Sequence, residues 1–109
     1  GQLRFQKPQP PSIWTERKFM DMQPNVCHQT DDSGYKVLEN TFMRWHPYGT
    51  YSEDCLYLNI YGPKMKTTYL PIIIWIHGGG FYKGSASLDM YNPKHFVDGN
   101  SVLFVSIQY

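Results

Sequence analysis

Three consecutive glycines, Gly78 to Gly80, follow His77 and have the clearest chemical potential in this chain. Glycine has no Cβ and adopts positive φ freely, so a ligand can approach bare backbone N–H groups there. The run directly follows Ile72–Ile76, an unbroken β-branched and aromatic stretch typical of a strand covered on both faces of a sheet. Open α/β sheets bind ligands at the carboxyl ends of their strands. The sequence therefore indicates a loop that can bind an oxyanion at a sheet edge.

Two phosphate-binding motifs fit the glycine run poorly. A Walker loop requires Gly-Lys followed by Ser or Thr, whereas the order here is Lys83-Gly84-Ser85. A dinucleotide fingerprint has the spacing G-x-G-x-x-G, whereas Gly78, Gly80 and Gly84 are spaced G-x-G-x-x-x-G. Two interpretations remain open: a His-Gly-Gly-Gly loop whose N–H groups bind the tetrahedral intermediate of ester hydrolysis, or a glycine-rich turn without a ligand.

Composition restricts the class of protein. The 109 residues are 41% hydrophobic and 17% aromatic, as in a folded chain. A formal net charge of +1 gives no electrostatic basis for binding nucleic acid. The longest apolar stretch is about eight residues, short of the roughly 20 that a transmembrane helix needs. Four scattered histidines and no C-x-x-C give zinc weak support, and we predict no cofactor.

Cys27 and Cys55 are the only two cysteines. They are either two unrelated buried thiols or the ends of one disulfide-closed loop. By loop entropy such a bridge contributes roughly 3–4 kcal/mol to stability. It also requires an oxidising compartment.

Two long segments lack a regular period. Residues 1–24 contain four prolines and are predicted to be extended or in turns, with apolar side chains as anchors; these anchors are Leu3, Phe5, Ile13 and Trp14. Residues 28–52 are polar and rich in turn formers. A loop of that length inside a compact domain is usually functional.

The remaining sequence predicts a small α/β arrangement. Residues 56–61 alternate as a half-buried strand, with Leu56, Leu58 and Ile60 on the inward side. A second strand covers about 69–76, and a third runs from Val102 to Tyr109. Between them, Asn92 and Pro93 predict the start of a short helix over roughly 93–98. Strand, glycine loop, helix and strand suggest a βαβ-like crossover in a partly parallel sheet.

Four blocks of sequence together resemble the type-B carboxylesterases. They occur in that family's order over nearly the whole chain: Gly1–Phe5 with the prolines that follow, Ser52–Ile60, His77–Phe81 and Val105–Tyr109. The resemblance implies an α/β-hydrolase fold. Residues 1–109 would then be the N-terminal portion of a carboxylesterase domain, incomplete at both ends.

Within this family the chain is most similar to the cholinesterases. Met43-x-Trp45-x-Pro47 precedes Ser-Glu-Asp-Cys, and the resemblance implies that Trp45 forms the floor of a choline site. Indole binds a quaternary ammonium by cation–π attraction worth about 0.5–2 kcal/mol. The alternative is a structural role, in which Trp45 packs under a disulfide loop and binds no ligand. By the same resemblance Tyr91 supports Trp45, and Tyr82 and Asp32 belong to a peripheral site.

The resemblance also assigns the loop residues and the cysteines. Gly79 and Gly80 would donate the oxyanion N–H groups, while Gly78 shapes the loop. Cys27 and Cys55 match the family's first disulfide. The implied location is extracellular, either secreted or anchored at the cell surface and potentially synaptic, and the complete protein can form homo-oligomers.

The implied activity is serine ester hydrolysis, with acetylcholine or a similar choline ester as the substrate. No G-x-S-x-G occurs in the chain, and the resemblance implies that the serine, histidine and acid of the triad lie beyond Tyr109. We therefore expect no activity from this piece alone. Departures from the common cholinesterase pattern leave a broad-specificity carboxylesterase as the alternative; they are Thr30, His46, His77 and Lys83. A non-catalytic cholinesterase-like adhesion protein is the alternative from another class.

Overall fold

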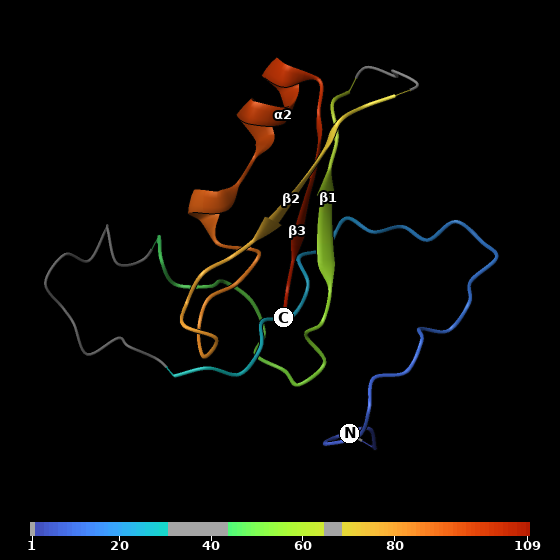
Figure 1. The fold of residues 1–109 in the computed structure, drawn as a ribbon, viewed down its shortest axis with the longest axis vertical. Coiled ribbons are helices and arrows are strands. Elements are labelled where there is room, and N and C mark those ends of the chain that lie inside the picture. The colour runs from blue at the N-terminus through green and yellow to red at the C-terminus, as the bar shows by residue number, and fades with distance from the viewer. Residues whose placement is uncertain (1, 31–43, 65–68) are drawn as a thin grey trace, which may run out of the picture.

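A computed structural model describes residues 2–30, 44–64 and 69–109. Its regular elements, in chain order (Figure 1), are β1 (Leu58–Tyr61), β2 (Ile72–Ile76), the 3-10 helix η1 (Asp89–Tyr91), α2 (Lys94–Asn100) and β3 (Leu103–Ile107). The sheet has the order β1-β3-β2, with β1 antiparallel and β2 parallel to β3. The predicted partly parallel sheet with a helical crossover is thus confirmed, and it is compatible with part of an α/β fold.

The crossover helix is positioned by its capping residues. It begins at Lys94, one residue later than predicted, because Pro93 precedes it with ψ near 9°. Asn92 still acts at the start, since its Oδ1 accepts a hydrogen bond from the Lys94 N–H at 3.1 Å. At the other end Asn100 donates to the Phe96 carbonyl at 2.8 Å, and Ser101 adopts φ 51°.

The helix covers one face of the sheet. Val97, 2% exposed, packs with Val102 and Phe104, and Tyr61 and Ile73 flank this cluster. Tyr61 and Ile73 both pair with Phe104 in the strand register, so all three strands contribute to the same face. Burial there raises the pKa of the Tyr61 phenol.

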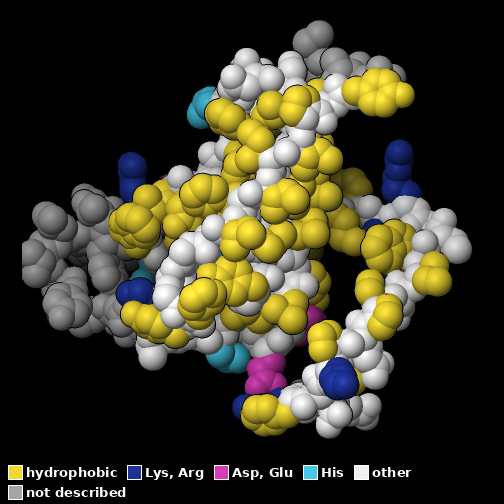
Figure 2. Space-filling model, in the orientation of Figure 1, with side chains coloured by type: hydrophobic (Ala, Val, Ile, Leu, Met, Phe, Trp, Pro, Cys, Tyr) yellow, Lys and Arg dark blue, Asp and Glu magenta, His cyan; other side chains and the backbone are white. Residues whose placement is uncertain are grey.

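The opposite face of the sheet is apolar and uncovered within the described residues, contrary to the prediction that β2 is buried on both sides. Side chains 53–63% exposed project from this face of β1 and β2, namely Leu58, Ile60, Ile72, Ile74 and Ile76. Figure 2 shows hydrophobic side chains gathered over the strands. The helix packs on the other face only.

The inward side of the first strand was therefore predicted wrongly. Leu58 and Ile60 face outward, and Leu56 lies before β1 and is 73% exposed. Asn59 and Tyr61 are the more buried residues. The reason is a polar contact: the Asn59 amide donates to Ser87 Oγ at 3.2 Å and to Ser106 Oγ at 3.3 Å. Alternation alone does not indicate which side of a strand meets such partners.

The N-terminal segment is extended or in turns, as predicted, and leads away from the sheet (Figure 1). Its apolar side chains do not act as anchors, because Leu3, Phe5, Ile13 and Trp14 are 56–94% exposed. An ion pair between Arg4 and Glu53 (3.3 Å) links it to the rest of the chain. In the described part of the chain, no helix is long and apolar enough to cross a membrane.

Candidate functional site

The glycine loop is a tight turn directly after β2. The Gly79 carbonyl accepts hydrogen bonds from the N–H groups of Tyr82 (3.3 Å) and Lys83 (3.1 Å), which closes the turn. Gly79 has φ 133°, and a Cβ there would collide with the carbonyl of Lys83. Both the backbone conformation and the close approach therefore require glycine at this position.

Two backbone donors of this loop have no protein acceptor among the described residues. The N–H groups of Gly79 and Gly80 take part in none of the hydrogen bonds recorded there. Gly80 is exposed and has φ 62°. Donors that point away from the protein's own acceptors are what an oxyanion requires.

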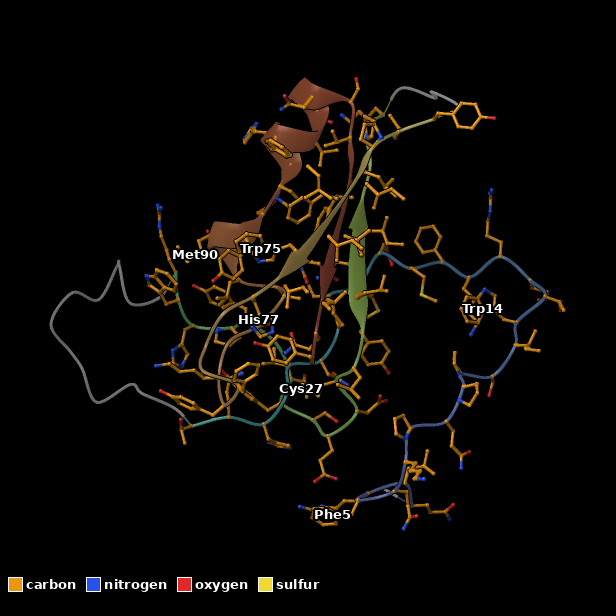
Figure 3. All side chains as sticks on the ribbon, viewed as in Figure 1. Phe5, Trp14, Cys27, Trp75, His77 and Met90 are labelled. Atoms are coloured by element: carbon orange, nitrogen blue, oxygen red, sulfur yellow. A yellow bond between two sulfur atoms is a disulfide. The ribbon has the colours of Figure 1, made fainter. Side chains whose placement is uncertain are left out.

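His77 forms the base of the loop and is 4% exposed. Its Nδ1 lies 2.8 Å from the Gly78 carbonyl, and since a carbonyl only accepts, Nδ1 carries the proton. The ring stacks on Tyr109 at 4.5 Å, while the Tyr109 hydroxyl donates to the His77 carbonyl at 2.9 Å. Its Nε2 is buried without a partner in the described structure. Figure 3 shows His77 just past the end of β2, between the sheet and Cys27.

A cavity of about 390 Å³ brings the glycine loop together with Trp45. Gly78 and Gly79 form part of its wall, and Trp45, itself 55% exposed, and Tyr91 form another part. Other residues complete the lining: Gln29, Thr30, His46, Pro47, Tyr51, Lys83, Gly84 and Leu88. The arrangement can hold a small molecule between an aromatic surface and the Gly79 end of the glycine loop, whereas Gly80 is not part of the lining.

Of the other predicted site residues, Tyr91 lines this cavity and Tyr82 does not. The Tyr91 ring packs on Trp75 at 5.0 Å, which fixes Tyr91 against β2. Tyr82 does not line the cavity of Trp45; it lines a smaller one of about 90 Å³ near His77. Asp32, like Met43, lies outside the described residues.

The predicted disulfide between Cys27 and Cys55 is present, with an S–S distance of 2.06 Å. A short bridge beside it joins the same two segments: the Val26 N–H donates to Thr50 and the Ser52 N–H donates to Val26, both at 2.9 Å. These contacts close the base of the loop that contains Trp45. The pKa of Tyr57 is raised by its hydrogen bond to Asp54 (2.8 Å), next to this base.

Sequence reasoning missed two glutamines that hold the glycine loop. Gln29 makes two hydrogen bonds to the backbone of Gly84. Gln108 accepts from the Ala86 N–H at 2.8 Å and from the Ser85 hydroxyl at 3.2 Å. Their partners are 22 to 55 residues away along the chain, so no local pattern signals them.

The described residues contain no group of three or more His, Cys, Asp or Glu side chains placed to hold a metal ion. The cavity places backbone N–H groups of the glycine loop beside an aromatic wall. Such donors stabilise negative charge that develops on oxygen.

Comparison with known proteins identifies the family of the chain. The family model of the carboxylesterase family matches residues 1–109. Acetylcholinesterases are similar to the chain over its whole length: 38% identity with that of Bungarus fasciatus, 38% with that of Electrophorus electricus and 40% with that of Gallus gallus. The chain spans only 18%, 17% and 14% of these relatives, respectively. On the match along its whole length, the chain belongs to the carboxylesterase family.

Proposed function

We propose that the protein containing this chain is a serine ester hydrolase that acts on choline esters such as acetylcholine. The observation that carries the proposal is the shared cavity, in which Trp45 and Gly79 line the same space. Similarity to acetylcholinesterases supports it. When the alcohol part of an ester is bound beside the oxyanion donors, the ester carbonyl lies next to those donors. Negative charge that develops on its oxygen in the transition state is then stabilised.

Each residue has a distinct role in this mechanism. A serine outside the described site attacks the ester carbonyl while a histidine, oriented by an acid, takes its proton and passes it to the leaving alcohol; water then hydrolyses the acyl-serine. The N–H groups of Gly79 and Gly80 stabilise the tetrahedral oxyanion. Each such donor is typically worth about 10²–10³ in rate. Trp45 binds the quaternary ammonium, and Tyr91 supports the same wall. Tyr82 and Asp32 receive the cation before it enters.

The disulfide supports an extracellular location for the protein, secreted or held at the cell surface. Homo-oligomers of the complete protein belong to the same proposal, because they follow from its resemblance to cholinesterases. Recovery of the complete protein from the culture medium or the cell surface tests the location, and size-exclusion chromatography tests the oligomeric state.

The experiment that tests the substrate compares acetylcholine with 3,3-dimethylbutyl acetate, which has the same shape without the charge. Trp45→Ala is expected to lower kcat/KM for acetylcholine about 3- to 30-fold more than for the neutral ester, in line with cation–π energies. Trp14→Ala is the matched control, since Trp14 lies on the N-terminal segment far from the cavity (Figure 3). An unchanged ratio in Trp45→Ala would remove Trp45 from ammonium binding.

A broad-specificity carboxylesterase is the second candidate. The cavity lining includes Lys83 and His46 but, among the described residues, no carboxylate. Such a lining favours neutral esters over cations. A wild-type kcat/KM that is higher for the neutral ester than for acetylcholine would select this candidate. The third possibility, a non-catalytic adhesion protein, predicts turnover of neither ester.

A further inference from the structure

Gly84, the last glycine of the loop, is hydrogen-bonded through its backbone to the side-chain amide of Gln29. Gln29 Oε1 accepts a hydrogen bond from the Gly84 N–H at 2.8 Å, and Gln29 Nε2 donates to the Gly84 carbonyl at 3.0 Å. Nε2 also lies 3.2 Å from the Cys27 carbonyl. One amide thus satisfies both backbone groups of Gly84 and connects them to the segment that carries the disulfide.

Gly84 is confined from the other side as well. A Cβ at this position would lie 2.5 Å from the Gly78 carbonyl oxygen and 2.7 Å from His77 Nδ1, so there is no room for a side chain here. His77 itself is buried and bonded to Gly78. Gly84 is therefore held between the Gln29 amide and the start of the same loop.

This contact fixes the two ends of the turn that presents the oxyanion donors. Gly79 bonds forward to Lys83, the neighbour of Gly84, and Gly78 touches Gly84 directly. The turn between these ends contains Gly80, which is exposed, and Phe81, which is 93% exposed. The Phe81 ring contacts the Tyr109 ring, with 6.2 Å between the centroids, and the hydrogen bonds from Gln29 restrain the end of the turn at Gly84.

We propose that Gln29 is a positioning residue of the oxyanion loop: it holds Gly84 so that the N–H groups of Gly79 and Gly80 point at the reacting oxygen. The proposal rests on the proposed function for its catalytic consequence. Gln29 also lines the cavity, but both of its bonds to Gly84 are made to the loop backbone, and the proposed role acts through that backbone. Its hydrogen bond to the Cys27 carbonyl also connects the glycine loop to the segment that carries the disulfide. The glycine-loop wall of the cavity and the Trp45 wall are thereby held in a fixed relative position.

The test substitutes Gln29 in the complete protein that carries this chain. Gln29→Met keeps the length of the side chain and removes every hydrogen bond, whereas Gln29→Glu keeps the acceptor for the Gly84 N–H. Gln9→Met applies the same chemical change at an exposed position of the N-terminal segment. Three quantities are measured: kcat and KM for the best ester, the affinity for a trifluoromethyl ketone, and hydrogen exchange of residues 78–85.

Gln29→Met is expected to lower kcat about 10- to 100-fold, as misplaced donors do, with KM changed less than about 3-fold. Affinity for the trifluoromethyl ketone, whose adduct imitates the oxyanion, is expected to fall in parallel with kcat/KM. Exchange at 78–85 accelerates, Gln29→Glu gives intermediate values, and Gln9→Met matches wild type. A variant that only unfolds at lower temperature would leave kcat per folded molecule unchanged.

Two results would overturn the inference: wild-type kcat and ketone affinity in Gln29→Met, or unchanged exchange at 78–85. If Gln29→Met folds poorly, the same measurements on Gln29→Glu decide the question, because that variant retains the acceptor for the Gly84 N–H. A wild-type protein without turnover would refute the proposed function, and the exchange measurement alone would then decide the role of Gln29 in the loop.

Discussion

At the scale of single residues, glycine is required at some loop positions and is incidental at others. Gly84 has φ 110° and lies against backbone and ring atoms, whereas a Cβ at Gly99 in α2 would meet nothing within 4 Å. The identity of the residue is therefore dictated by the backbone path in one case and not in the other. This contrast gives a matched pair of substitutions.

Gly84→Ala is expected to destabilise the protein by roughly 2–4 kcal/mol, because the methyl group meets the Gly78 carbonyl in a strained backbone conformation. Gly99→Ala is expected to stabilise it by about 0.5–1 kcal/mol, because alanine restricts the unfolded chain inside a helix. Denaturant unfolding of both variants provides the measurement. Equal stabilities for the two would contradict the described path of the loop.

The sequence predicts the donor loop at this scale but not its supports. The His-Gly-Gly-Gly run consists of neighbouring residues, so its motif can be identified directly from the sequence. Gln29 and Gln108 act through contacts with segments far along the chain, and nothing near them in sequence distinguishes a bonding amide from a solvated one.

At the scale of elements, the disulfide and its neighbouring bridge close the loop that contains Trp45. Cys27 and Cys55 are 28 residues apart, and loop entropy then gives roughly 3–4 kcal/mol of stabilisation. The bridge at Val26 and Tyr51 adds backbone hydrogen bonds at the same place. The position of Trp45 in the cavity wall therefore depends on a disulfide whose cysteines do not line the cavity.

Replacing both Cys27 and Cys55 by serine is expected to lower the free energy of unfolding by about 3–4 kcal/mol. We also expect KM for acetylcholine to rise more than KM for its neutral analogue, since the position of Trp45 is less restricted. The comparison is with wild-type protein treated with a thiol reductant, which should show the same loss. A double variant with wild-type stability would mean that the bridge contributes nothing to the loop.

The strands were predictable to different degrees. The apolar runs of β2 and β3 indicate strands directly, and their parallel pairing follows from the helix between them. The inward side of β1 was not predictable, because Asn59 meets Ser87 and Ser106 from 28 and 47 residues away.

At the scale of the whole molecule, one face of the sheet lacks a covering layer in the described residues. Ile72, Ile74 and Ile76 are 62–63% exposed, and the chain spans 14–18% of the similar acetylcholinesterases. Apolar area of this kind drives association when it meets water. Most of the length of these relatives has no counterpart in this chain. Residue types alone therefore could not predict whether another layer covers this face of the sheet.

The chain expressed alone is expected to self-associate through this face and to bind a hydrophobic dye. Ile74→Lys should reduce both effects, since Ile74 is 63% exposed. Ile73→Lys is the matched control on the other face, where burial of a charge beside the Val97 cluster should unfold the chain. Light scattering and dye fluorescence give the result, and a monomeric wild-type chain that binds no dye would contradict the exposure of this face.

If this chain supplies the oxyanion loop of a serine ester hydrolase, the complete protein reacts covalently with an inhibitor that modifies an activated serine. The complete protein is treated with a fluorophosphonate, the stoichiometry is measured by intact mass, and the modified residue is mapped by peptide mass spectrometry. We expect one modified serine per molecule, outside residues 1–109, and slower labelling when Gly79 is replaced by alanine. Absence of labelling, or labelling of a serine within residues 1–109, would contradict it.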